Sequence, residues 1–400
     1  MKAARSVKKL FVLAGITLCV GFALPAQTWT QTSAPTNIWS SIACSADGAK
    51  IYACAGGGPI TSPGGLEPIY ISTNGGLTWT NTAAPSNYWS NIACSADGTK
   101  VIATASYTSA HLGGVYTSTD GGATWLSNNI APSGWFSVAS SADGAPFFAA
   151  NAFGQLLMTT NAGLIWVTNA QKSLWVGTSA DGVTLIIVST GSKICTSTNS
   201  GATGITNNVS CPFLSSVAIS ADGKVLAGVT DSTGSRALIL TSTNFGATWV
   251  TNSWPGKTWD HIAVSADGTK MIAASGILIG PIFTSTNSGQ TWIPNNIPFA
   301  NWNAVACSAD GNKLMAVSVS PNGSVWISQT TPSPTLSIAS TNDLQFSWLI
   351  PSTNFVLQQS SDLANWSDVI NTPVLNLTNL QNQVTLPLSA DNSFYRLKTP

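Results

Sequence analysis

The sequence is poor in the side chains that most enzymes use for acid–base chemistry. Charged residues make up only 8% of its 400 residues, and it holds one glutamate, Glu67, and two histidines. Glycoside hydrolysis generally needs a pair of carboxylates, so few pairs are available for such a reaction. Runs of basic residues are absent after the N-terminal segment, which disfavours nucleic acid and anionic lipid as partners.

The scarcity of Glu, Lys and Arg also argues against long helices. Gly, Ser, Thr and Asn are abundant instead, and short runs rich in Val, Ile, Thr and aromatic residues alternate with turn residues. This composition favours many short strands joined by tight turns. We therefore expect an all-β protein.

Residues 1–26 read as a secretory signal. A basic start precedes the apolar stretch LFVLAGITLCVGFAL, and LPA supplies small residues for cleavage after Ala26. A retained membrane anchor is the alternative, but the run is short for a span of about 20 residues. Cleavage leaves 11 basic against 15 acidic residues, a net charge near −4. We expect a monomer that is secreted, periplasmic or at the cell surface, without membrane insertion.

Two motifs alternate along the chain. SADG occurs seven times, and between its copies lies a motif of the form STNxGxTW. Asp-Gly favours a two-residue hairpin turn with positive φ at both residues. In the second motif, Asn or Asp can bond the backbone ahead, glycine supplies a left-handed residue, and Trp packs back on the hairpin. The SADG aspartates are Asp47, Asp97, Asp143, Asp181, Asp222, Asp267 and Asp310, and the second motif starts at residues 72, 118, 159, 197, 242 and 285.

Each repeat is predicted to hold four strands, A to D, with SADG between A and B and the second motif between C and D. Units of four strands at this period are typical of propeller blades. The lengths vary mainly in the B–C loops, while the D–A connections are nearly constant. Both tight turns then share one face of the disc, and the B–C and D–A loops share the other. We expect a ligand on that loop face, because it carries the unrepeated residues.

The last repeat lacks its final strand. After Asp310 comes GSVWISQ (323–329) with no second motif, whereas QTWTQ (27–31) at the start of the mature chain resembles a fourth strand without its preceding three. Trp29 precedes Trp39 by ten residues, as Trp79 precedes Trp89. We predict that residues 27–31 pair with the C-terminal repeat and close a ring of seven blades spanning residues 27–331.

The second motif resembles the Asp-box, or BNR, repeat of sialidases, xyloglucanases, sortilin-type receptors and photosystem II assembly factors. The resemblance implies a β-propeller in which the boxes mark the fold and carry no active site. Five of the six copies have Asn where the family usually has Asp, and only Asp120 keeps the acid. A sialidase also clamps its substrate with three arginines, but the repeats hold only Arg236. The sialidase catalytic residues are therefore missing.

Residues 332–400 lack the repeat. Their short apolar runs predict about six strands, and the pattern LQFSW…FVLQQSSDLANWSDV…FYRL resembles a sandwich-type module at the C-terminus of many exported bacterial proteins. We expect a small β-sandwich-like domain there.

The cysteines suggest packing and one cross-link. Six remain in the mature chain, and Cys44, Cys94 and Cys307 share the position before SADG, where we expect small buried apolar residues. The spacing CxxC is absent, so structural zinc is disfavoured. Cys195 and Cys211 flank the fourth copy of the second motif, whose Trp is replaced by glycine. We predict a disulfide there that compensates for the lost packing.

The function expected from the sequence is a non-catalytic binding or scaffolding module for an extracellular glycan or an envelope protein, with no cofactor and no metal. A polysaccharide-active glycoside hydrolase, using Asp231, Asp260 or Glu67, and an envelope-complex assembly factor are the alternatives. His261 falls on a predicted A strand and is interpreted as an ordinary strand residue. The candidate ligand contacts on the loop face are Glu67, Tyr88, Tyr107, His111, Asp231, Arg236, Trp254, Lys257 and Phe299.

Overall fold

The computed structural model is all-β, with 35 strands and no helix in the residues that it describes. No helix of that part of the chain is long and apolar enough to cross a membrane. The predicted signal, residues 1–26, lies outside the described residues. These are 28–56, 65–106, 113–128, 130–131, 133–189, 193–207, 209, 214–230, 237–254, 258–276, 279–320, 323–330, 336–340, 343–349, 355–377, 380–388 and 393–398.

Residues 29–329 form seven antiparallel sheets of four strands each, numbered here in chain order. The first three are β2–β5 (Trp39–Cys44, Ile51–Ala55, Ile69–Ser72, Thr80–Asn81), β6–β9 (Trp89–Cys94, Val101–Ala105, Val115–Ser118, Leu126–Ser127) and β10–β13 (Trp135–Ser140, Phe147–Asn151, Leu156–Thr159, Val167–Thr168). The fourth and fifth are β14–β17 (Trp175–Thr178, Leu185–Ser189, Lys193–Ser197, Ile205–Thr206) and β18–β21 (Leu214–Ile219, Leu226–Thr230, Ala237–Ser242, Val250–Trp254). The sixth is β22–β25 (His261–Val264, Met271–Ala274, Ile282–Ser285, Ile293–Pro294), and the seventh joins β26–β28 (Asn301–Cys307, Lys313–Ser320, Val325–Gln329) to β1 (Trp29–Gln31).

The sheets pack face to face around a closed cycle. The first strands contact one another in the order β2, β6, β10, β14, β18, β22, β26 and back to β2. Each seam between neighbouring sheets holds its own apolar core. Because the inner strands are covered on both faces, they are apolar without alternation, as in β3 (IYACA), which is buried throughout. Five tryptophans in or just before the first strands are fully buried in these cores, namely Trp39, Trp89, Trp135, Trp259 and Trp302.

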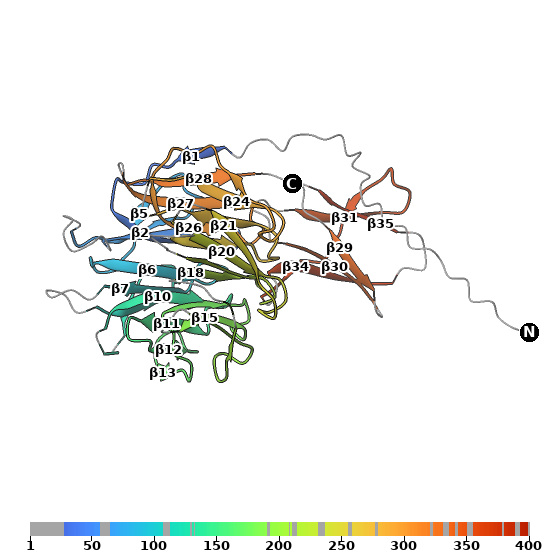
Figure 1. Cartoon of the computed structure of the whole chain (residues 1–400). Helices are drawn as coiled ribbons and strands as arrows, with labels where there is room; N and C mark the ends of the chain where they lie inside the picture. The colour runs from blue at the N-terminus through green and yellow to red at the C-terminus, as the bar shows by residue number, and fades with distance from the viewer. Residues whose placement is uncertain are drawn as a thin grey trace, which may run out of the picture.

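The seventh sheet is assembled from both ends of the repeat region. β1 pairs antiparallel with β28, Trp29 opposite Ser328 and Gln31 opposite Trp326 (Figure 1, blue beside orange). The Trp29 indole also donates a hydrogen bond to Asn295 Oδ1 at 3.2 Å. The predicted pairing of the N-terminal segment with residues 323–329 is confirmed for Trp29–Gln31.

The SADG turn differs from the predicted two-residue Asp-Gly turn. In the first copy, Gly48 N donates to Ser45 O at 2.9 Å, so Ala46 and Asp47 are the central residues. Only Gly48 has a positive φ, at 66°. Asp47 stays outside the left-handed region because its carboxylate accepts hydrogen bonds from Ala49 N and from the Ser45 hydroxyl. The aspartate therefore stabilises the turn through its side chain, and the prediction of positive φ at both residues was wrong.

The SADG alanines join all seven sheets through the backbone. The N–H of each alanine donates to the carbonyl oxygen of the alanine in the next sheet, at 2.7–2.9 Å. The last alanine donates to the first, so the hydrogen bonds form a closed cycle. Its members are Ala46, Ala96, Ala142, Ala180, Ala221, Ala266 and Ala309.

The second motif folds as its sequence predicts, with one addition. In its first copy, Asn74 Oδ1 accepts a hydrogen bond from Thr78 N at 2.9 Å, and the Trp79 indole donates to Gly76 O at 3.2 Å. The residue before that glycine also has a positive φ, and in four copies it carries a side chain. These four residues are Ala162, Ser200, Phe245 and Ser288.

The C-terminal residues form two further sheets, beside the seven (Figure 1). A four-stranded sheet has the order β29 (Ser337–Ser340), β30 (Asp343–Leu349), β34 (Gln381–Pro387), β33 (Val374–Asn376), and a three-stranded sheet has the order β32 (Ser367–Asp368), β31 (Val356–Ser360), β35 (Phe394–Lys398). Phe346, Trp348 and Tyr395 belong to their shared apolar core.

Candidate functional site

The sole glutamate lies on the seam between the first and second sheets. The Glu67 backbone exchanges two hydrogen bonds with Asn87, and its carbonyl oxygen accepts from the Trp89 indole at 2.8 Å. The carboxylate accepts a hydrogen bond from Asn37 Nδ2 at 3.0 Å. Burial and the negative charge of Glu67 raise the pKa of the neighbouring Tyr70, because both disfavour a phenolate. Glu67 is thus an acidic group in a fixed position.

Tyr88 follows Asn87 on the same seam and is half-buried. Asn87 holds the local backbone, because its Oδ1 accepts a hydrogen bond from Tyr88 N at 2.9 Å. The structure therefore brings two predicted contact residues, Glu67 and Tyr88, to one seam. Sequence reasoning missed Asn37 and Tyr70, because nothing in the repeat marks side chains that meet across a loop.

Phe299 lies on a different seam. The residue after it, Ala300, pairs with Gly280 as Asn87 pairs with Glu67, and the Trp302 indole donates to Gly280 O. Phe299 is 62% exposed, on the seam between the sixth and seventh sheets. Two sheets therefore separate it from the Glu67 seam.

The other predicted contact residues are not placed beside Glu67, Tyr88 or Phe299 by the part of the chain that the structure describes. Trp254 is the last residue of β21, where its backbone pairs with Ala237. The remaining candidates lie outside the described residues and stay predictions: Tyr107, His111, Asp231, Arg236 and Lys257.

Aromatic rings from three sheets meet inside the cycle. Trp175 of β14 contacts Phe136 of β10, with ring centroids 5.1 Å apart, and lies 6.5 Å from the His261 ring of β22. Burial lowers the pKa of His261 to about 4, so its imidazole is neutral at pH 7. His261 is a strand residue, as predicted, but it faces an aromatic cluster that the sequence did not indicate. The detectable signal was Trp175, at the strand position where other repeats carry Ser41 or Asn91.

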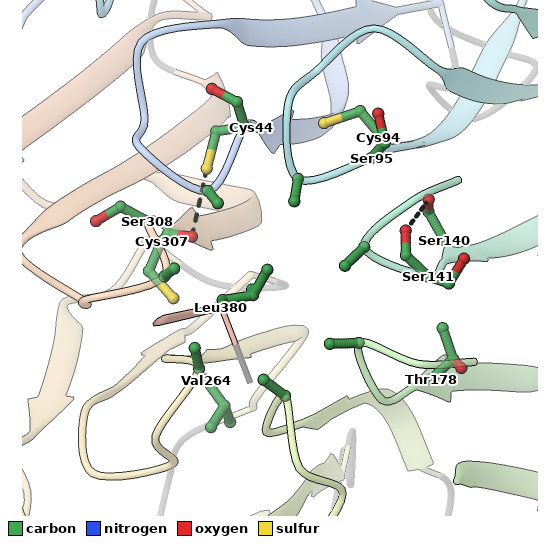
Figure 2. A pocket seen from close by; sticks show the side chains of 18 of the residues that line it. Cys44, Cys94, Ser95, Ser140, Ser141, Thr178, Val264, Cys307, Ser308 and Leu380 are labelled. Carbon is green, nitrogen blue, oxygen red and sulfur yellow. Dashed lines mark hydrogen bonds between the residues drawn. The ribbon is translucent and has the colours of Figure 1, made fainter. Parts of the chain in front are cut away.

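A cavity of about 170 Å³ lies closer to the SADG turns than this aromatic cluster does (Figure 2). Its wall includes the residues before SADG, among them Cys44, Cys94 and Cys307. The Cys44 thiol donates to Cys307 O at 3.3 Å, and all three are free thiols. Burial raises the pKa of Cys94 and Cys307 to about 12, so these thiols stay protonated at pH 7. Leu380, from the C-terminal sheets, also lines this cavity.

In the fourth copy of the second motif, other side chains lie beside the glycine that replaces Trp. A methyl group at Gly204 would lie 2.6 Å from Cys195 Sγ, so the thiol and Gln171 occupy the space above the glycine. Cys195 carries a free thiol here, and Cys211 lies outside the described residues. The disulfide stays a prediction.

The aspartates of the repeats are used by the turns. All seven SADG aspartates accept a hydrogen bond from the backbone N–H two residues ahead. Asp120 accepts from Thr124 N and Thr124 Oγ1, which lowers the pKa of its carboxyl. Among the described residues, no group of three or more His, Cys, Asp or Glu side chains could hold a metal ion.

The two described carboxylates of residues 29–329 outside the turns do not share a seam. Glu67 lies between the first and second sheets, whereas Asp260 immediately precedes β22 of the sixth. The seventh sheet stands between them on the shorter way round the cycle. The Asp260 carboxylate packs where a methyl group at Gly276 would overlap it. The described residues therefore bring no such pair together.

Comparison with known proteins identifies the fold. No family model matches the chain, and no curated protein matches it. Among solved structures it is similar to YCF48 from Cyanidioschyzon merolae (TM-score 0.55, 15% identity, covering 75% of this chain and 98% of that one). It is also similar to YCF48 bound to D1 peptide (TM-score 0.55, 15% identity, 76% and 97%). The GH74 xyloglucanase from Xanthomonas campestris gives a TM-score of 0.57 at 12% identity (81% and 59%). The neighbours are β-propellers, and at these identities the similarity shows the fold alone.

Proposed function

We propose that the chain is a seven-bladed β-propeller of the Asp-box type (residues 27–331), closed by its N-terminal strand and followed by a β-sandwich-like domain (residues 332–400). After removal of residues 1–26 it acts outside the cytoplasm as a monomeric, non-catalytic binding or scaffolding module. Its ligand, an extracellular glycan or an envelope protein, binds on the face that carries the B–C and D–A loops.

One observation carries the non-catalytic part of the proposal, namely the use of the carboxylates. Seven SADG aspartates and Asp120 are tied to their own turns by hydrogen bonds. Of the carboxylates outside the turns that the structure describes, Glu67 lies between the first and second sheets and Asp260 immediately before the sixth, whereas paired glycosidase carboxylates stand roughly 5–10 Å apart. Asp231 lies outside the described residues. A binding surface has no need of such a pair, and its specificity can come from single fixed groups such as Glu67.

The loop face suits binding because its residues differ from sheet to sheet. The Glu67 seam offers a carboxylate held by Asn37 beside half-buried Tyr88, and Phe299 offers an exposed ring two sheets away. A carboxylate with nearby aromatic side chains can recognise a sugar hydroxyl or a peptide N–H equally well. The fold accommodates both ligand classes, since its neighbours include a peptide-bound YCF48 and a xyloglucanase.

The test incubates the mature protein with a panel of polysaccharides and, separately, with solubilised envelope from the native cells. Retention on a polysaccharide without released sugars supports glycan binding, and stoichiometric co-purification of one envelope protein supports a protein partner. Robust sugar release contradicts the non-catalytic proposal. Absence of both retention and co-purification contradicts the binding proposal.

Variants then place the ligand. Glu67→Gln keeps the size of the side chain and removes its charge, and we expect about tenfold weaker binding, or about 1.4 kcal/mol. The matched control is Asp222→Asn, because that carboxylate lies in a SADG turn, exposed beside Lys224. Equal loss in both variants would contradict a site on the loop face.

A further inference from the structure

One leucine of the C-terminal sheets reaches into the cycle of seven sheets. Leu380 directly precedes β34, where Gln381 pairs with Asn376 of β33. Leu380 packs against the SADG alanines and lines the cavity that contains the three thiols. Figure 2 shows its side chain in the middle of the opening, between Val264 and Cys307 on one side and Ser141 on the other.

Leu380 has a backbone conformation that leucine rarely adopts. Its φ is +55°, in the left-handed region where Gly and Asn are favoured. A leucine here breaks the local preference of the hairpin, so a gain elsewhere must offset the strain. Its apolar contacts with the alanine cycle provide that gain, because they remove the side chain from water.

The partner surface has the size and chemistry for one apolar side chain. The seven alanines form a collar of methyl groups whose own N–H and C=O groups are satisfied around the cycle. A polar or charged group entering the collar would therefore find no free backbone partner there. A single leucine fits this surface.

The channel, the space enclosed by the cycle of sheets, is also narrowed on the side of the cavity away from Leu380. Trp175 and His261 lie three residues before Thr178 and Val264, which line the cavity, so the aromatic cluster is about 10 Å further along the strands. The rings of Phe136, Trp175 and His261 come from three sheets and meet across the interior. The thiol cavity thus lies between the aromatic cluster and Leu380.

We propose that the C-terminal sheets are an intramolecular cap on the SADG face of the propeller, and that Leu380 narrows the thiol-lined end of the channel. The cap stands independently of which ligand the loop face binds. It leaves the loop face as the open side of the molecule and slows the access of reagents larger than water to Cys44, Cys94 and Cys307, which are half-buried around the cavity.

The three thiols are built-in reporters of this access. The mature full chain is treated with N-ethylmaleimide, and peptide mass spectrometry gives the labelling rate at each cysteine. We expect slow labelling of Cys44, Cys94 and Cys307 in the parent, and a rise of about tenfold or more in Leu380→Asn, because Asn keeps the left-handed backbone but not the apolar side chain. Cys54, buried in the core between the first and second sheets, should keep its slow rate.

Two variants control the interpretation. Leu380→Met should label as slowly as the parent, since it restores an apolar side chain of similar size. Leu363→Asn changes another leucine with positive φ (+66°) in the C-terminal sheets, but one that is exposed and outside the cavity, and it should have no effect. If Leu380→Asn does not fold, Leu380→Gly, which also tolerates the left-handed backbone and removes the side chain, gives the same test.

Three results would overturn the cap. The first is fast labelling of the three thiols in the parent chain. The second is an equal labelling rate in the parent and in Leu380→Asn or Leu380→Gly. The third is a parallel rise in the labelling rate of Cys54, because that would show general loosening of the sheets instead of easier access past residue 380.

Discussion

The two faces of the ring of sheets are built on different principles. On the SADG face every sheet contributes the same alanine, the same aspartate-bonded turn and the same hydrogen bond to its neighbour. On the loop face the equivalent seam position is Glu67 in one sheet and Gly280 in another, although the tryptophan indole that bonds it is shared. The repeated residues therefore close the ring. On the loop face the backbone hydrogen bonds repeat from seam to seam, but the side chains differ.

Both faces depend on a closed ring of sheets, so opening the ring should have the largest effect on stability. Deleting residues 27–31 removes β1, its pairing with β28 and the Trp29 hydrogen bond to Asn295. We expect a loss of about 3–5 kcal/mol in the free energy of unfolding, comparable to removing a large core side chain. Thermal and urea denaturation measure it, with Thr30→Ala, an exposed position, as control. A loss no larger than that of the control would show that β1 is a frayed end.

The second prediction tests the aromatic cluster inside the ring. The folded protein holds His261 neutral down to a pKa of about 4, whereas the unfolded chain protonates it near 6.5. Below pH 6.5 the unfolded state binds more protons, so stability falls as the pH drops from 6.5 to 4. The loss attributable to His261 is about 3 kcal/mol at pH 4. The free energy of unfolding of the parent minus that of His261→Gln, measured by urea unfolding, should therefore fall by about 3 kcal/mol between pH 7 and pH 4. A difference that stays constant with pH contradicts the prediction.

The third prediction concerns the loss of one hydrogen bond from the cycle of SADG alanines. Ala46 occupies the second position of its turn, which tolerates proline, so Ala46→Pro keeps the turn and removes the N–H that bonds Ala96 O. We expect a loss of about 1–3 kcal/mol, because a carbonyl oxygen loses its donor. Ala46→Ser retains the N–H and should lose much less. Equal stability of the two variants would mean that the cycle is dispensable.

The smallest effect concerns the only second motif that carries an acid. Hydrogen bonds from Thr124 lower the pKa of Asp120, so its carboxylate stabilises the fold above the unfolded pKa of 3.8, and this contribution is lost as the pH falls through the folded pKa. Asp120→Asn should be slightly less stable than the parent at pH 7, and the gap should narrow below pH 4. Urea midpoints at pH 7 and pH 3 measure it. A gap that widens in acid contradicts this account.

Local patterns predicted the framework well and the interior less well. The ten-residue spacing of Trp29 and Trp39 was enough to predict a strand pairing between residues about 300 positions apart. The geometry of the SADG turn was wrong because the Asp47 side chain, and not a positive φ, stabilises it. The aromatic cluster and the Leu380 contact join residues from different sheets, and no periodicity along one strand encodes which sheets face each other across the channel.

The candidate contact residues that the structure describes lie on more than one seam. Glu67 and Tyr88 do share a seam, since both flank the position where a loop pairs with the next A strand. Phe299 was assigned to the same surface only because it is an unrepeated aromatic residue, and it lies two sheets away. Position around the ring depends on sheet number, which a list of unrepeated residues ignores.

The alanine hydrogen bonds have one more consequence. Seven amides that all donate in the same direction around a circle have no first donor and no last acceptor, unlike a helix or an open strand, whose ends leave polar groups unpaired. The peptide dipoles circulate, so they concentrate no charge at the mouth and offer an ion nothing to hold. The alanine backbone thus places no net dipole along the axis of the ring. Selectivity for any solute on this axis must come from the side chains that each sheet contributes.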